Sequence, residues 1–177
     1  MKTLILALGN PILSDDGVGH EVADRLAERL PSTNCYFGAE CNNRTVSTIS
    51  AGSCPQPNMQ YDIIKSSAAT MDIIPKLAGY DRLAVIDAVQ LGSAPPGTVH
   101  RFSITDLAST IRRSSPHDVN FATALQMGKE WGYRIPTDIR IYGIEVIELL
   151  RFSENCTAEV AAKLDEIVEQ ILSGLIE

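Results

Sequence analysis

Apolar and polar positions follow two different periods along the chain, and the change of period marks the predicted elements. Residues 3–8 (TLILAL) form a continuous apolar run, as expected for a strand covered on both faces. Residues 16–30 follow with the spacing of an amphipathic helix, whose apolar positions are Val18, Val22, Leu26 and Leu30. This pattern predicts a strand that leads through a short loop into a helix.

The same rhythm recurs along the rest of the chain. Further strands are predicted near 61–64, at 82–89 (RLAVIDAV), at 98–103 (TVHRFS) and at 138–146, with helices near 69–77, at about 118–131 and after Thr157. This alternation predicts an α/β three-layer sandwich in which a mostly parallel, twisted sheet of about five strands has helices on both faces. Residues 98–103, which follow a Pro-Pro-Gly turn, are the expected antiparallel edge strand.

One segment breaks the pattern. Residues 31–59 are polar, aperiodic and interrupted by proline and glycine, so we predict an irregular insertion within a single domain that spans residues 1–177. Such a loop is either a functional lid or a mobile surface segment.

Composition narrows the class of protein. The chain has 177 residues, of which 45% are hydrophobic and 21% charged, and its net charge of −7 argues against binding to nucleic acid. No apolar run approaches the roughly 20 residues of a membrane span, so we expect a cytoplasmic protein without membrane contact. The four cysteines form no CxxC pair and are expected to remain thiols.

Three acidic residues stand where the predicted strands end. Asp15 and Asp16 are adjacent, so on a helix their side chains would diverge by about 100° and could not share a proton. The simpler explanation is that one of them caps the helix and that both are stabilised by its positive end. Asp87 ends an otherwise apolar strand, at the edge of an α/β sheet where ligands bind, although it could also cap the next loop.

A histidine completes a possible metal site. His117 precedes a predicted helix, where its imidazole would stay neutral and could bind a metal; His20 and His100 are weaker candidates. Asp16, Asp87 and His117 could converge on one sheet edge, as a mixed oxygen and nitrogen set suited to nickel or zinc. The sequence has no GxSxG, P-loop or GxGxxG motif that would indicate another chemistry.

Four motifs occur together in this order: GNxxxxDDGxG after the first strand, a strand that ends in IDA, a PPGT turn, and SPH before a helix. In these four motifs and in their order, the chain resembles the hydrogenase maturation endopeptidases. The resemblance implies an aspartic-type endopeptidase that removes the C-terminal extension from the large-subunit precursor of a nickel-iron hydrogenase after nickel insertion. One departure is the segment KSSAAT, where members of the family often have a glycine-rich stretch.

Carried over by motif, the resemblance assigns the metal-contacting and catalytic roles to Asp16, Asp87 and His117, and leaves Asp15 as the cap. It also implies that nickel is contributed by the substrate, with no permanent cofactor, and that a monomer acts on the large-subunit precursor. Two alternatives remain open. One is a non-catalytic, nickel-sensing assembly chaperone, and the other is a domain that binds a small ligand and whose acids only cap helices.

Overall fold

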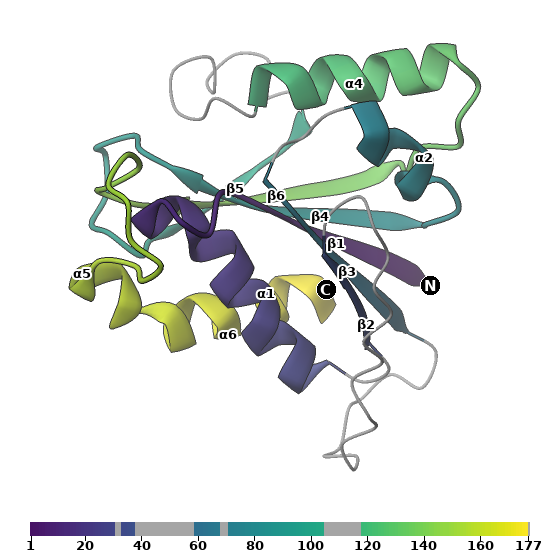
Figure 1. The fold of residues 1–177 in the computed structure, drawn as a ribbon. Helices are drawn as coiled ribbons and strands as arrows, with labels where there is room; N and C mark the ends of the chain where they lie inside the picture. Colours follow the sequence, from purple (N-terminus) through teal and green to yellow (C-terminus); the bar gives the residue numbers. More distant parts are fainter. Residues whose placement is uncertain (31–32, 38–58, 68–70, 105–117, 177) are drawn as a thin grey trace.

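The computed structural model describes residues 1–30, 33–37, 59–67, 71–104 and 118–176 (Figure 1). Within these residues one six-stranded sheet has the strand order β2-β3-β1-β4-β6-β5. The strands are β1 (Lys2–Leu8), β2 (Thr33–Phe37), β3 (Gln60–Ser66), β4 (Arg82–Val89), β5 (Val99–Phe102) and β6 (Asp138–Glu145). The pair β5 and β6 is antiparallel and the other pairs are parallel, which confirms the predicted edge strand.

Helices cover both faces of the sheet. The helical elements are η1 (Ser14–Gly17), α1 (Val18–Arg29), η2 (Met71–Ile73), α2 (Ile74–Leu77), α4 (Asp118–Glu130), α5 (Ala158–Ala161) and α6 (Leu164–Ile176). In Figure 1, α2 and α4 lie above the sheet, whereas α1 and α6 lie below it. The predicted three-layer α/β fold is therefore confirmed.

The alternation of side chains along β1 explains why residues 4–8 are apolar without interruption. Leu4, Leu6 and Leu8 belong to the core cluster shared with α2 and α4, whereas Ile5 and Ala7 belong to the cluster shared with α1 and α6. Because both faces are covered, apolar side chains are favoured on both sides of the strand. All eight residues of β4 are likewise buried, including the acidic Asp87.

Two elements differ from the sequence prediction. Residues 33–37, predicted to be part of an irregular insertion, form β2 and pair with β3; residues 38–58 lie outside the described part. Backbone pairing with an existing strand stabilises such an edge strand, although its short sequence TNCYF has no clear strand pattern. The predicted final helix is divided into α5 and α6, and the backbone N–H of Lys163 donates to the carbonyl of Val160 in a tighter turn between them.

Across the described ranges, none of the helices combines the length and the apolar character needed to cross a membrane.

Candidate active site

The candidate site lies at the carboxyl end of the parallel strands, where the chain leaves β1. Gly9 has a φ of +128°, and a Cβ atom there would lie 1.9 Å from the backbone oxygen of Asp16. A Cβ atom on Gly19 would lie 2.5 Å from the carbonyl oxygen of Leu8 and 3.1 Å from that of Ile86. The glycines of the GNxxxxDDGxG motif therefore let η1 and α1 approach the ends of β1 and β4 closely.

Asp16 lies in η1 and is 7% exposed. Its Oδ2 accepts a hydrogen bond of 2.6 Å from the backbone N–H of Asn10, which is the one hydrogen bond of this carboxylate within the described part of the chain. An ionised carboxylate can accept about four hydrogen bonds. Most of the lone pairs of Asp16 therefore remain available to a ligand.

Asp15 has a different environment and is fully buried. Its Oδ1 accepts from the backbone N–H of Thr157 at 2.6 Å, and its Oδ2 accepts from the Thr157 hydroxyl at 3.0 Å. The backbone N–H groups of Ile147 and Glu148 also donate to Oδ2, at 3.3 and 3.2 Å. The prediction that one of the two aspartates caps its own helix is wrong, because neither η1 nor α1 has a side-chain cap; Asp15 instead anchors the distant segment 147–157.

Asp87 occupies the carboxyl end of β4 and is 2% exposed. Its Oδ1 accepts from the backbone N–H of Ala88 at 2.9 Å. The 3-10 turn η1, which carries Asp16, packs against β4. Two acidic side chains that are 71 positions apart in the sequence, at 16 and 87, thus come from neighbouring elements at one edge of the sheet.

The third predicted ligand, His117, lies outside the described residues. Among the residues that the structure does describe, no group of three or more His, Cys, Asp or Glu side chains is arranged to hold a metal ion. The three-residue metal site therefore remains a prediction, of which the structure locates the two acidic members.

A cavity of about 120 Å³ lies beside η1, and neither Asp16 nor Asp87 lines it. His20 on one wall accepts or donates a hydrogen bond of 3.4 Å with the carbonyl of Ser66, and burial lowers the pKa of its imidazole. On another wall, burial raises the pKa of the Cys156 thiol to about 11. This thiol stays protonated at neutral pH, which argues against its use as a nucleophile.

Sequence reasoning missed the buried acid Glu145. Glu145 is 2% exposed, and its Oε1 accepts from the backbone N–H groups of Leu91 and Gly92, both at 2.8 Å. Its Oε2 lies 2.9 Å from Nε2 of His100, one of the two weaker candidate histidines. An acid near the end of the predicted strand 138–146, after the apolar residues 141–144, is the same kind of signal that singled out Asp87. Glu145 therefore holds the loop that follows β4.

The two acids can serve chemistry that needs carboxylate oxygens. Neighbouring carboxylates at the edge of a sheet can bind a divalent cation, or one of them can accept a proton from water. Of the adjacent aspartates Asp15 and Asp16, Asp16 is the better placed to bind a ligand, because the hydrogen bonds of the Asp15 carboxylate hold the segment 147–157.

Comparisons with known proteins show which family has this fold and these motifs. The profile of a family described as hydrogenase maturation protease matches residues 44–174, well over half of the chain. The hydrogenase 2 maturation protease of Escherichia coli (strain K12) is 23% identical over 180 residues, which cover 100% of this chain and 92% of that protein.

Solved structures agree on the fold. The hydrogenase maturating endopeptidase HybD from E. coli has a TM-score of 0.72 at 22% identity, and the match covers 99% of this chain and 92% of that one. The NiFe hydrogenase maturation protease HybD from Thermococcus kodakarensis has a TM-score of 0.71 at 23% identity, and both chains are covered completely. The glycine-dependent turn and the two acids at the sheet edge agree with the profile match over residues 44–174, and the chain belongs to the hydrogenase maturation protease family.

Proposed function

We propose that this protease removes the C-terminal extension from the large-subunit precursor of a nickel-iron hydrogenase after nickel insertion, and that Asp16, Asp87 and His117 contact the nickel of that substrate. The observation that carries the proposal is the juxtaposition of η1 with β4, which places the buried acids Asp16 and Asp87 on neighbouring elements. The proteins to which this chain is similar are named for the maturation of hydrogenases.

The chemistry of the ligands supports nickel as the recognised ion. Carboxylate oxygens and an imidazole nitrogen suit a borderline divalent metal such as nickel. The Asp16 carboxylate makes one hydrogen bond in the described part of the chain, so it can bind a cation without first losing several partners. Metal binding would also offset part of the cost of a buried charge.

Binding to the metal of the substrate would position the peptide bond to be cut. Once the acids contact nickel, the scissile bond lies near them, and the reaction no longer depends on a chance encounter with the right geometry. Water, activated by the ion or by one of the carboxylates, then attacks the peptide carbonyl. The new C-terminus and the released extension are the products.

The test uses purified protein and two forms of precursor, nickel-loaded and nickel-free, with the mass of the large subunit as readout. We expect loss of the C-terminal peptide from the nickel-loaded form alone. Single substitutions Asp16→Ala, Asp87→Ala and His117→Ala should each slow cleavage by about 100-fold or more, as expected when a metal or proton-transfer contact is removed.

Asp165→Ala is the matched control. Asp165 is an exposed acid on α6 whose ion pairs with Arg25 and Arg29 lie at the surface, so its loss should leave cleavage unchanged. An unchanged mass of the nickel-loaded precursor with the unsubstituted protein would contradict the proposed function and would favour an assembly chaperone. Full cleavage by any one of the three variants would remove that residue from the mechanism.

A further inference from the structure

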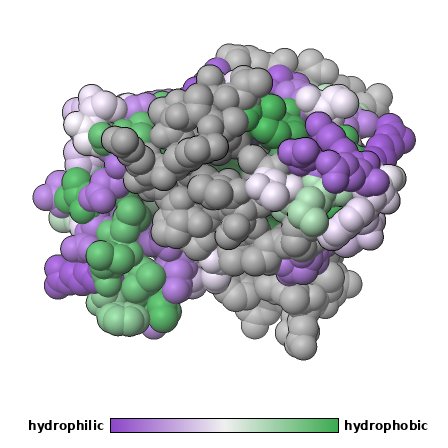
Figure 2. Space-filling view, turned by 90° about the horizontal axis from the view of Figure 1, so that it is seen from above, coloured by the Kyte–Doolittle hydropathy of each residue, from purple (hydrophilic) through white to green (hydrophobic). Residues whose placement is uncertain are grey.

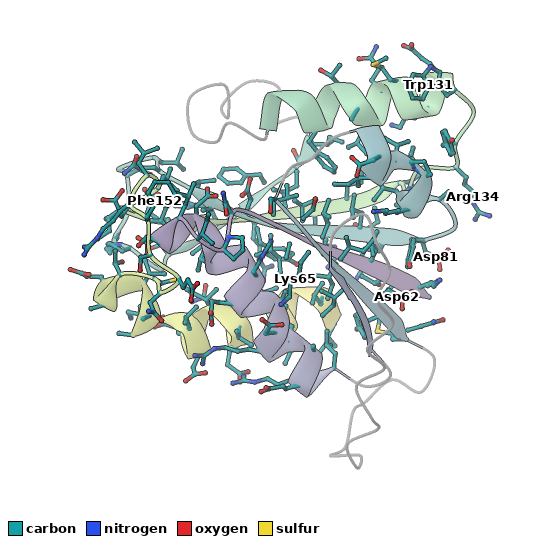
Figure 3. The ribbon with its side chains drawn as sticks, in the orientation of Figure 1. Asp62, Lys65, Asp81, Trp131, Arg134 and Phe152 are labelled. Atoms are coloured by element: carbon teal, nitrogen blue, oxygen red, sulfur yellow. The ribbon has the colours of Figure 1, made fainter. Side chains whose placement is uncertain are left out.

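Four large apolar side chains are exposed around the segment that Asp15 anchors. We call Ile12, Ile147, Leu150 and Phe152 the apolar ridge. Leu150 and Phe152 are the most exposed, at 83% and 80%. Figure 2 shows hydrophobic side chains gathered at its lower left, and Figure 3 places Phe152 at the corresponding end of the molecule, beside η1. Leaving a Leu or Phe side chain in water forgoes about 1.5–3 kcal/mol each, so a cluster of them indicates a contact with another molecule.

The backbone under the ridge is held in place from both ends. Beyond the bonds of Asp15 to positions 147, 148 and 157, Oε1 of Glu148 accepts from the N–H groups of Leu150 and Arg151, at 2.9 and 3.1 Å. The N–H of Ser153 donates to the carbonyl of Ile12 at 3.0 Å. The ridge is thus ordered before any partner binds, which lowers the entropic cost of association.

The ridge is also continuous with the candidate site. Ser14, in the turn that carries Asp16, donates its N–H to the carbonyl of Ser153 at 2.8 Å. Leu13 and Ser153 form a parallel bridge. A molecule seated on the ridge would therefore lie next to the acids, and the fully buried Asp15 fixes both features relative to each other.

We infer that the apolar ridge is the docking surface for the folded body of the hydrogenase large-subunit precursor, an inference that rests on the proposed function. None of the four side chains lines the cavity beside η1, and the two most exposed project from the loop. Protruding Leu and Phe side chains fit pockets on a folded partner better than they clasp an extended tail. The charged neighbours Glu148 and Arg151 form the polar rim that is common around such apolar anchors.

The test compares the double variant Leu150→Ser, Phe152→Ser with Trp131→Ser. Trp131 is a second exposed aromatic residue, 58% exposed, and Figure 3 shows it at the opposite end of the molecule. Steady-state cleavage of nickel-loaded precursor should show a KM about 30-fold higher for the ridge variant, as expected for the loss of interface anchors, with kcat within about twofold. Trp131→Ser and the conservative Leu150→Met should both keep the original KM.

The outcomes separate this inference from the proposed function. If the unsubstituted protein does not cleave the precursor, the proposed function fails and the docking inference fails with it. If the unsubstituted protein cleaves and the ridge variant has the same KM as Trp131→Ser, the docking inference alone is overturned. Sedimentation of the unsubstituted protein and the ridge variant tests a further outcome. If the substitutions dissociate an oligomer and leave KM unchanged, the ridge binds a second copy of this chain and the inference is overturned. Thermal unfolding confirms that each variant is folded.

Discussion

At the scale of single residues, Asp15 and Asp16 are neighbours in sequence with separate tasks. Within the described residues, every hydrogen bond that the Asp15 carboxylate accepts comes from the segment 147–157. The Asp16 carboxylate accepts one hydrogen bond in the described part, from the backbone N–H of Asn10 in the loop after β1. One aspartate therefore stabilises the structure, and the other remains able to bind a ligand.

Substitution by alanine should separate the two tasks. We expect Asp15→Ala to lower the free energy of unfolding by about 3 kcal/mol or more, because it leaves several buried donors without an acceptor. Asp16→Ala should change it by about 1 kcal/mol or less while abolishing cleavage. Urea unfolding followed by circular dichroism measures the first effect, and the precursor assay measures the second. Equal destabilisation by the two variants would contradict this division.

The sequence could predict that the two side chains diverge, since that follows from helical geometry. It could not predict which aspartate becomes structural. That choice depends on Thr157, whose backbone and hydroxyl reach Asp15 from 142 positions away. The expectation of a helix cap failed for the same reason, because the donors came from another part of the chain.

At the scale of elements, the turn from β1 into η1 decides where Asp16 lies. Gly9 has a backbone conformation that side chains rarely adopt, and it contacts the backbone of Asp16 too closely for a Cβ atom. The turn therefore works only with glycine at this position.

Gly9→Ala should be strongly destabilising, by about 3 kcal/mol or more, because strain and a clash with backbone occur together. Gly79→Ala is the matched control. Gly79 also has a positive φ, of +91°, but no atom lies within 4 Å of the added Cβ, so backbone strain of about 1 kcal/mol is the expected cost. Chemical denaturation measures both. A similar loss for the two variants would show that the close approach to Asp16 contributes nothing.

Elements with long apolar patterns were predictable, and those that depend on a neighbour were not. The runs at 3–8 and 82–89 became β1 and β4 because strands buried on both faces are mostly apolar on both sides. Strand β2 has no such signal, since its stability comes from pairing with β3. Pattern alone also could not show where the last helix divides into α5 and α6.

At the scale of the whole molecule, the two edges of the sheet have different roles. The carboxyl edge holds the acids, whereas the amino edge joins the sheet to α6. Arg82, which is 5% exposed, donates from Nε to Asp138 at 2.6 Å and from Nη1 to the carbonyl of Leu175 at 2.8 Å. One arginine thus connects β4, β6 and the end of α6.

Arg82→Met should lower the free energy of unfolding by about 2 kcal/mol, since the carbonyl of Leu175 and the half-exposed Asp138 both lose a donor. Cleavage per folded molecule should not change, because the acids lie at the other edge. Urea unfolding of Arg82→Met, Asp138→Asn and the double variant gives the coupling energy between the two residues. A coupling near zero would mean that Arg82 acts through Leu175 alone.

The same pair predicts a dependence on pH. Burial tends to raise the pKa of Asp138, but the hydrogen bonds from Arg82 and Arg140 outweigh it, so the pKa lies below its ordinary value. The folded protein therefore binds this proton less readily than the unfolded chain. The ionised Asp138 contributes to the free energy of unfolding. This contribution is complete above the pKa of an aspartate in the unfolded chain and is lost as the pH falls through the pKa of Asp138 in the folded protein. Because Asp138 is 40% exposed, solvent keeps the effect small, and it should be absent in Asp138→Asn.

The sequence by itself determined the alternation of strands and helices, the antiparallel edge strand and the family motifs, because each follows from the local period of apolar residues or from short fixed spacings. Tertiary structure decided the rest. It brought η1 against β4, gave Asp15 its donors from 147–157, paired Glu145 with His100, and exposed Leu150 and Phe152 on an ordered loop. These outcomes depend on contacts between residues far apart along the chain, and no local pattern encodes which distant groups will meet.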